Sequence, residues 1–235
     1  QFGRLAASLL ASRFDIVVHD AAGLRETIEG LGLRAGDLAQ AAACDVVVVG
    51  VPVAAMREVL ERAAPHVKPG ALVVDVGSVK VLPVQWMLEA LPAHADIVAT
   101  HPLFGPQSAR GGLAGQRLVI CPVRGDRHHR IAEIAESLGL VVSITTPEEH
   151  DREMAYVQAL THLIGRALVS LDIPDEELKT RSYQHLLDLC GLVGGDSFEL
   201  FSAIQTMNPH ARDVAGRFVA EAQRLLDEVG QANPT

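Results

Sequence analysis

Short, continuous runs of Val, Ile and Leu alternate with segments of helical length through the first 146 residues, and this pattern constrains the fold most. The predicted strands cover residues 14–20, 45–52, 71–76, 96–100, 118–121 and 141–145. Helices are predicted over residues 4–12, 54–64, 79–91 and 127–138. Because the strands are continuously apolar, we expect them to be buried on both faces, as parallel strands covered by helices are. The pattern predicts an α/β domain.

The pattern changes at Pro147. From residue 148 to residue 228 the periodicity is helical, and no run indicates a strand. We therefore expect an α/β domain over residues 1–146 and an all-helical domain over residues 147–235. The chain has 235 residues, of which 49% are hydrophobic, and this suffices for one large core or two modest ones.

Charge and composition exclude several classes of protein. The formal charge is −9 and the basic residues are scattered, which argues against nucleic acid or an anionic membrane surface as a partner. No apolar run approaches the roughly 20 residues that cross a bilayer, and no basic leader precedes an apolar segment. Cys44, Cys121 and Cys190 are spaced too irregularly for a disulfide framework or a zinc site. We expect a soluble cytoplasmic protein without a bound metal.

Gly3 opens the first predicted helix with no strand before it. It has the place of the third glycine in a Gly-x-Gly-x-x-Gly turn, which would leave the first strand of a dinucleotide-binding domain missing from this chain. The strand predicted over residues 14–20 ends in Asp20, at about the 20-residue separation at which a carboxylate binds an adenosine ribose. Asp20 there would favour NAD over NADP, although a solvated strand end is the alternative interpretation.

Two further strand ends carry candidate cofactor contacts, because ligands of doubly wound sheets lie across the carboxyl ends of the strands. Gly50, Val51 and Pro52 end one strand, where the glycine allows close approach of a dinucleotide and the proline stiffens the exit. After the next strand, Gly77 permits an unusual backbone angle, and Lys80 supplies positive charge.

Ser78 and His101 are the candidate catalytic residues. Ser78 offers a hydroxyl at a helix start, and a simple N-cap is an equally good interpretation. His101 follows the strand predicted over residues 96–100 and is held by Pro102. An imidazole fixed there can take a proton near neutral pH, whereas the alternative is a histidine that caps a turn.

Three motifs resemble successive signatures of the prephenate and arogenate dehydrogenase family of tyrosine biosynthesis. They are Asp75-x-Gly-Ser-Val-Lys80, Thr100-His-Pro-Leu-Phe-Gly-Pro106 and His150-Asp-x-x-Met-Ala-x-x-Gln-Ala-Leu-Thr-His162. The similarity runs from Gly3 to about Pro209. It implies a Rossmann-type dinucleotide-binding domain followed by an all-α dimerisation domain, and an NAD(P)-dependent oxidative decarboxylation.

The resemblance also implies roles for single residues. His101 would be the general base that takes the proton of the substrate's ring hydroxyl, and Ser78 would hydrogen bond to His101 or to the same oxygen. Gln158, Thr161 and His162 recur at helical intervals and would contact the substrate, although a buried polar group satisfied within the core is the alternative. We expect His150 and Asp151 to cap the start of that helix.

The choice of substrate depends on a departure from the family pattern. Prephenate-specific members usually present an arginine in the later helical region, where this chain reads Gly194-Gly-Asp-Ser-Phe-Glu-Leu200. Asp196 would pair with the ammonium group of arogenate and repel the keto acid side chain of prephenate. We therefore favour arogenate, while Arg166, Lys179 or Arg181 leave prephenate open.

Two other classes remain as alternatives. Another NAD-dependent dehydrogenase of the hydroxyacid type would share both domains but would usually place a catalytic lysine on the long helix, and this chain has none there before Lys179. A non-catalytic dinucleotide sensor would have no need of Ser78 together with His101. The apolar residues from Leu186 through Phe198 and Phe201 to Phe218 predict a homodimer formed through residues 150–230.

Overall fold

The computed structural model of the protein describes residues 2–232. The chain divides into two compact units, Gln1–His150 and Asp151–Thr235, with the boundary inside α7 (Pro147–Met154). We describe each unit by itself.

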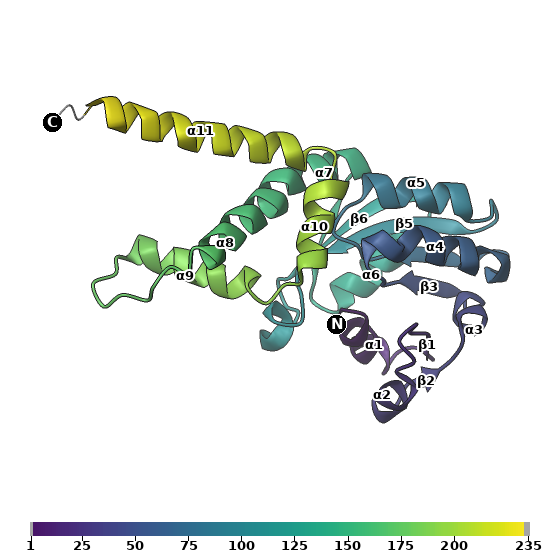
Figure 1. Ribbon diagram of the computed structural model, residues 1–235. Coiled ribbons are helices and arrows are strands. Elements are labelled where there is room, and N and C mark those ends of the chain that lie inside the picture. The colour runs from purple at the N-terminus through teal and green to yellow at the C-terminus, as the bar shows by residue number, and fades with distance from the viewer. Residues whose placement is uncertain (1, 233–235) are drawn as a thin grey trace. The chain divides into compact units, whose positions relative to one another are not determined.

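Strands and helices alternate through the first unit (Figure 1). Its strands are β1 (Val17–Val18), β2 (Arg34–Ala35), β3 (Val46–Val49), β4 (Leu72–Asp75), β5 (Asp96–Pro102), β6 (Arg117–Arg124) and β7 (Val141–Ile144). Its helices before α7 are α1 (Phe2–Leu10), α2 (Arg25–Gly30), α3 (Leu38–Ala42), α4 (Val53–Ala63), α5 (Val81–Ala90) and α6 (His128–Ser137). Short 3₁₀ turns cover Ala64–His66 and Ser108–Gly111.

Five strands form the main sheet in the order β3-β4-β5-β6-β7. The pairs β3/β4, β4/β5 and β6/β7 are parallel, but β5 and β6 are antiparallel. The expectation of parallel strands throughout was therefore wrong at this pair. A strand covered on both faces is equally apolar in either direction, so periodicity alone does not reveal the reversal.

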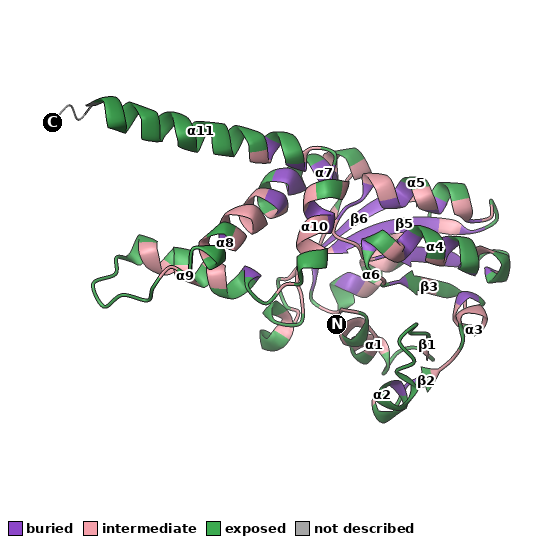
Figure 2. Ribbon diagram, in the orientation of Figure 1, coloured by how far each residue is buried: buried purple, intermediate pink, exposed green. Residues whose placement is uncertain are grey.

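Helices cover both faces of this sheet. On one face α4 and α5 bury Met56, Leu60 and Met87 against Val73 of β4 and Ile97 of β5. On the other face α6 contributes Ala135 to a cluster with Leu72, Val74, Val98 and Ile120. Neighbouring residues of β4 and β5 thus belong to opposite cores, as expected for strands buried on both sides. Figure 2 shows buried residues along β5 and β6.

The N-terminal region differs from the prediction. Only Val17–Val18 of the strand expected over residues 14–20 is extended, and it pairs in parallel with β2 in a separate two-stranded sheet. Phe14 is 46% exposed, and the charged residues on both sides of the valines lack a core to pack against. The strand expected before Gly3 lies outside the described residues.

Helices joined by loops make up the described residues of the second unit, 151–232. Its elements are a π-helical segment, η3 (Ala155–Leu160), followed by α8 (Thr161–Ser170), α9 (Arg181–Val193), α10 (Phe198–Met207) and α11 (Ala211–Ala232). Thr180 and Ser197 cap α9 and α10 by accepting hydrogen bonds from the amides of Tyr183 and Leu200. Among the described helices, none combines the length and hydrophobicity that crossing a membrane requires.

Gly165 fixes a close crossing of α8 with α9. A Cβ built on this glycine would lie 2.5 Å from Cγ2 of Val193 and 3.2 Å from Cγ of Leu189. Gly165 is therefore buried at a helix–helix contact.

Candidate active site

A buried ionic network ties the carboxyl ends of β4 and β5 together. Asp75, the last residue of β4, forms an ion pair with Lys80, and neither side chain has exposed surface. Lys80 Nζ also donates to the Thr100 carbonyl oxygen at 2.7 Å. Asp75 accepts from the Thr100 amide at 3.2 Å, and the Thr100 hydroxyl donates to the Asp75 carbonyl at 2.6 Å. The network fixes the backbone immediately before His101.

This network changes the interpretation of Lys80. We expected its positive charge to be offered to a ligand at the strand end. Instead the ammonium group is buried and neutralised by Asp75, because a lysine with no access to water needs a carboxylate and hydrogen-bond acceptors.

His101 lies in β5 and is 4% exposed. Its Nδ1 is 2.9 Å from Nε2 of His150, which belongs to α7 and is also buried. The two rings meet edge to face, with centroids 5.1 Å apart. Burial lowers the pKa of His101 well below the usual 6.5, and the nearby His150 and Lys80 lower it further. The imidazole is therefore neutral near pH 7, which is the protonation state of a general base.

His150 and Asp151 do not cap the helix, contrary to expectation. Helix α7 begins at Pro147, and Thr146 Oγ1 accepts the Glu149 amide at 3.2 Å, so Thr146 has the capping role. Asp151 is fully buried, and its carbonyl accepts a 2.7 Å hydrogen bond from Asn208 Nδ2. No signal in the sequence pairs His101 with a histidine 49 residues away.

Ser78 and Gly77 follow β4. Ser78 is half-buried, but it is not the N-cap of α5, since Lys80 precedes that helix. Among the described residues, Ser78 and His101 form no hydrogen bond with each other, and Nδ1 of His101 contacts His150 instead. Gly77 does not have the unusual backbone angle that we expected. Its amide donates to Asp75 Oδ2 at 2.9 Å, and a Cβ there would lie 3.1 Å from that oxygen.

Gly3 and Gly50 come together where α1 meets the end of β3. A Cβ built on Gly50 would lie 3.9 Å from the Cα of Gly3 and 3.7 Å from Val76, while nothing lies within 4 Å of one built on Gly3. The protein's own packing thus leaves room for side chains at both positions. Bare backbone at a helix start fits a ligand that approaches the main chain closely, as a dinucleotide pyrophosphate does.

The remaining cofactor candidates are Val51, Pro52 and Asp20. Val51 is half-buried and packs against the core between the sheet and helices α4 and α5. Pro52 precedes α4 as its N-cap residue. Asp20 is exposed beyond β1, and its Oδ1 accepts the Ala22 amide at 2.8 Å. Asp20 does not contact the Gly3 and Gly50 positions.

In the second unit, three of the predicted substrate contacts lie close together in the sequence. Gln158 is in the π-helical segment, and its Oε1 is buried without a hydrogen-bond partner among the described residues. Thr161 and His162 open α8 and are half-buried. The sequence predicted one regular helix here, whereas a π segment changes the angular spacing of the side chains it contains and is frequent at functional sites.

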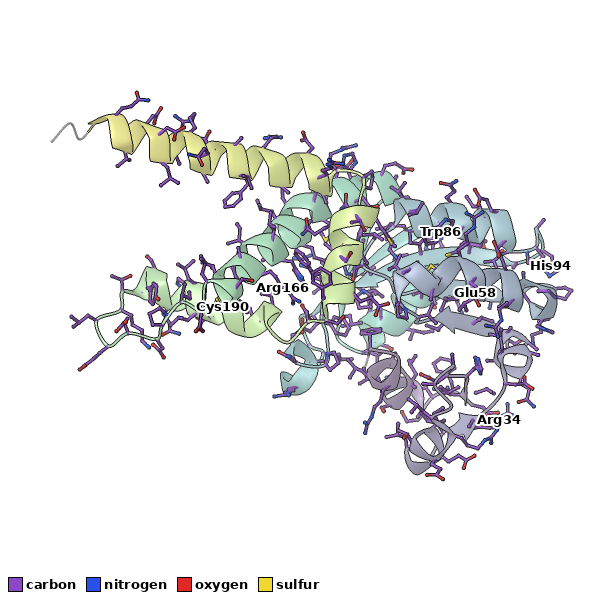
Figure 3. All side chains as sticks on the ribbon, in the orientation of Figure 1. Arg34, Glu58, Trp86, His94, Arg166 and Cys190 are labelled. Atoms are coloured by element: carbon purple, nitrogen blue, oxygen red, sulfur yellow. The ribbon has the colours of Figure 1, made fainter. Side chains whose placement is uncertain are left out.

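Asp196 faces His162, with 3.8 Å between Asp196 Oδ2 and His162 Nδ1. Burial lowers the pKa of His162, Asp196 opposes this shift, and Arg166 adds to it. Arg166 NH1 donates to the Asp196 carbonyl at 2.9 Å (Figure 3). The Arg166 guanidinium also lies over the rings of Phe198 and Phe201, at 5.7 and 5.5 Å from their centroids. Arg166 is thus engaged within its own unit.

The sequence matches two families of known domains. The family described as "Prephenate dehydrogenase, nucleotide-binding domain" matches residues 19–155, which is more than half of the chain. The family described as "TYRAAT1-like, C-terminal domain" matches residues 167–230.

Curated relatives and solved structures agree with the first match. The chain is 32% identical over 224 residues to arogenate dehydrogenase 2, chloroplastic, of Arabidopsis thaliana, which covers 89% of this chain and 62% of that protein. It is 28% identical over 196 residues to the probable arogenate/prephenate dehydrogenase of Methanocaldococcus jannaschii. This match covers 79% of this chain and 44% of that protein. The chain therefore spans less than two thirds of either relative.

The fold resembles prephenate dehydrogenase from A. aeolicus in complex with hydroxyphenyl propionate and NAD+. The TM-score is 0.74 at 22% identity, and the match covers 97% of this chain and 85% of that one.

Proposed function

This chain belongs to the prephenate dehydrogenase family, and from this premise we propose that it catalyses the NAD-dependent oxidative decarboxylation of prephenate or arogenate. The observation that carries the proposal is His101, a buried imidazole with a lowered pKa at the end of a central strand. The Asp75–Lys80 network supports it, because it fixes the backbone on which the imidazole depends.

In the proposed reaction, Nε2 of His101 takes the proton of the substrate's ring hydroxyl, and Ser78 helps to orient that oxygen. NAD, when bound, would supply the acceptor for the hydride on the carbon that carries this hydroxyl. The ring carboxylate leaves as carbon dioxide, its bonding electrons enter the ring, and the ring becomes aromatic. The electrons end on the former hydroxyl oxygen, which takes back the proton from His101 and becomes the phenol of the product. The residues of this chain therefore move one proton and return it.

We propose that residues 1–146 form the dinucleotide-binding domain. Gly3, Gly50, Val51, Pro52 and Gly77 would accept the cofactor along their backbone, and the open Cβ positions of Gly3 and Gly50 support this. Asp20 would bind the adenosine ribose and favour NAD over NADP, because a carboxylate repels a 2′-phosphate. The solved structure that contains NAD+ is that of the A. aeolicus prephenate dehydrogenase, whose fold is similar.

For the substrate we propose contacts from Gln158, Thr161, His162 and Asp196, in the helical domain over residues 147–235. Three observations favour arogenate over prephenate. Asp196 presents a partly exposed carboxylate for an ammonium group, and Arg166 is held by the Asp196 carbonyl and two aromatic rings. Lys179 is ion-paired with Asp175, which leaves fewer cations for the keto acid side chain.

We also propose that the protein is a cytoplasmic homodimer formed through residues 150–230. Large apolar side chains remain exposed on the second unit by itself: Tyr156, Val157, Leu171, Leu192, Phe198, Val219, Leu226 and Val229. Such a surface is typical of an interface. The three cysteines are free thiols, which is compatible with a reducing compartment.

The test is NADH formation by the purified chain with L-arogenate, prephenate or a small hydroxyacid, with NAD and NADP compared in parallel. The proposal expects turnover with arogenate, less with prephenate and a preference for NAD. Turnover of the hydroxyacid alone would indicate the other dehydrogenase class. NAD binding without any turnover would indicate a dinucleotide sensor.

A further inference from the structure

The contact between His101 and His150 restricts how protons are placed on the two rings. Nδ1 of His101 and Nε2 of His150 are 2.9 Å apart, a distance at which one nitrogen must carry a proton and the other must present a lone pair. Each neutral imidazole carries one proton in total. Only two arrangements of this neutral pair are therefore possible.

These arrangements differ in their consequence for Nε2 of His101. If His150 donates, the single proton of neutral His101 must be on Nε2, and that nitrogen cannot accept another. If His101 donates from Nδ1, its Nε2 has a free lone pair and can act as a base. Because Nδ1 is occupied by His150, Nε2 is the only ring nitrogen that can serve a substrate.

We propose that His150 is a positioning residue that accepts the Nδ1 proton of His101 and so keeps Nε2 of His101 unprotonated. This assignment rests on the function proposed above only in one respect, namely that Nε2 takes a proton from the substrate. When that nitrogen takes a proton, the Nδ1–H of the resulting imidazolium still donates to His150. The same hydrogen bond thus orients the base before proton transfer and stabilises its charge afterwards.

The surroundings of the pair hold the two rings in contact. His101 is 4% exposed and His150 is 2% exposed, so water does not readily replace either partner. His150 is held in α7, where its amide donates to the Thr146 carbonyl at 2.9 Å. The backbone of His101 follows Thr100, whose amide and carbonyl are bound by Asp75 and Lys80. Strand and helix therefore hold the two rings from opposite sides of the bond.

The tautomer can be read directly by NMR of the whole protein labelled with ¹⁵N-histidine, without any substrate. The signals of His101 are assigned by their loss in His101→Asn. In the wild type we expect a proton on Nδ1 and none on Nε2. In His150→Gln the amide oxygen can still accept the Nδ1 proton, so the same tautomer is expected. In His150→Phe the acceptor is gone, and the Nε2-protonated form should increase. A wild-type His101 protonated on Nε2 would overturn the proposal.

Kinetics supply the second measurement. His150→Phe should lower kcat by about tenfold or more with an unchanged Kd for NAD, because fewer molecules hold the reactive tautomer. His150→Gln should restore most of this loss. The matched control is His94→Phe, which removes another histidine hydrogen bond of the first unit, from Nε2 to the Val67 carbonyl at 3.0 Å (Figure 3). It should leave kcat unchanged.

The outcomes separate this proposal from the proposed function. Equal losses of kcat in His150→Gln and His150→Phe, with the tautomer unchanged in both, would overturn the positioning role. The expected tautomer in a wild type that oxidises neither arogenate nor prephenate would refute the proposed function and leave the assignment of His150 standing. If His150→Phe does not fold, the tautomers of the wild type and of His150→Gln still decide.

Discussion

The buried Asp75–Lys80 pair joins the two strand ends from which the proposed base emerges. Replacing Lys80 by Met leaves the Asp75 carboxylate without its cation and with no exposed surface. We expect Lys80→Met to lower the free energy of unfolding by about 3–5 kcal/mol, the usual result of removing one partner of a buried pair. Denaturant unfolding measures this change.

The matched control is Lys68→Met, because Lys68 pairs with Asp45 at 2.6 Å on the surface, where water replaces the lost partner. Lys68→Met should have little effect. Similar losses of stability in the two variants would contradict the description of the Asp75–Lys80 network.

The lowered pKa of His101 predicts where activity is lost in acid. The free base is neutral until the pH falls through its pKa, which burial, His150 and Lys80 place well below 6.5. The proton then occupies the base, and kcat/KM declines. We expect the acid limb of kcat/KM to have its midpoint below pH 6.5. A midpoint at or above 6.5 would contradict the electrostatic account.

At the scale of elements, the crossing of α8 and α9 depends on the absence of a side chain at Gly165. A methyl group there would lie 2.5 Å from Val193 Cγ2, so the Val193 side chain or one of the helices must shift. We expect Gly165→Ala to destabilise the protein by about 1–3 kcal/mol, as overpacking does. Gly191→Ala in α9 is the control, since nothing lies within 4 Å of that position. It should raise stability slightly, because alanine favours helix. Thermal unfolding of both variants checks this, and equal effects would exclude a close crossing at Gly165.

The elements also show what the sequence could and could not predict. Runs such as residues 71–76 and 96–100 were recognised because both faces of β4 and β5 are buried. The strand over residues 118–121 was predicted, but its antiparallel direction as β6 was missed because burial does not depend on strand direction. The short β1 was overestimated, because valine-rich sequence forms a long strand only where a core covers it.

For the site, the motifs led to His101, but its contact with His150 depends on folding. From the sequence, His150 was interpreted as a residue that caps the start of the helix. Only the tertiary structure places its ring against His101 of β5. Likewise, the π segment around Gln158 leaves no regular pattern in the sequence. Local patterns thus identify candidate groups, whereas their pairing is a property of the whole fold.

At the scale of the whole molecule, the proposed homodimer has a clear structural test. Helix α11 is exposed over most of its length (Figure 2), and its exposed residues include an apolar stripe. The stripe consists of Phe218, Val219, Leu225, Leu226 and Val229. A charge introduced there should disrupt association, so Leu225→Glu combined with Leu226→Glu is expected to convert dimer to monomer. Light scattering after size exclusion measures the mass. Gln223→Glu on the same helix should remain dimeric, and a monomeric wild type would refute the proposal.

The most direct test of the central claim is a comparison of the wild type with His101→Asn in turnover and in cofactor binding. We predict that the substitution lowers kcat for arogenate or prephenate by about 100-fold or more, because proton removal from the ring hydroxyl loses its base. The Kd for NAD should stay nearly unchanged, since the imidazole acts on the substrate and not on the dinucleotide. Retention of more than about a third of the wild-type kcat would contradict the assignment of His101 as the base, and with it the account of this site.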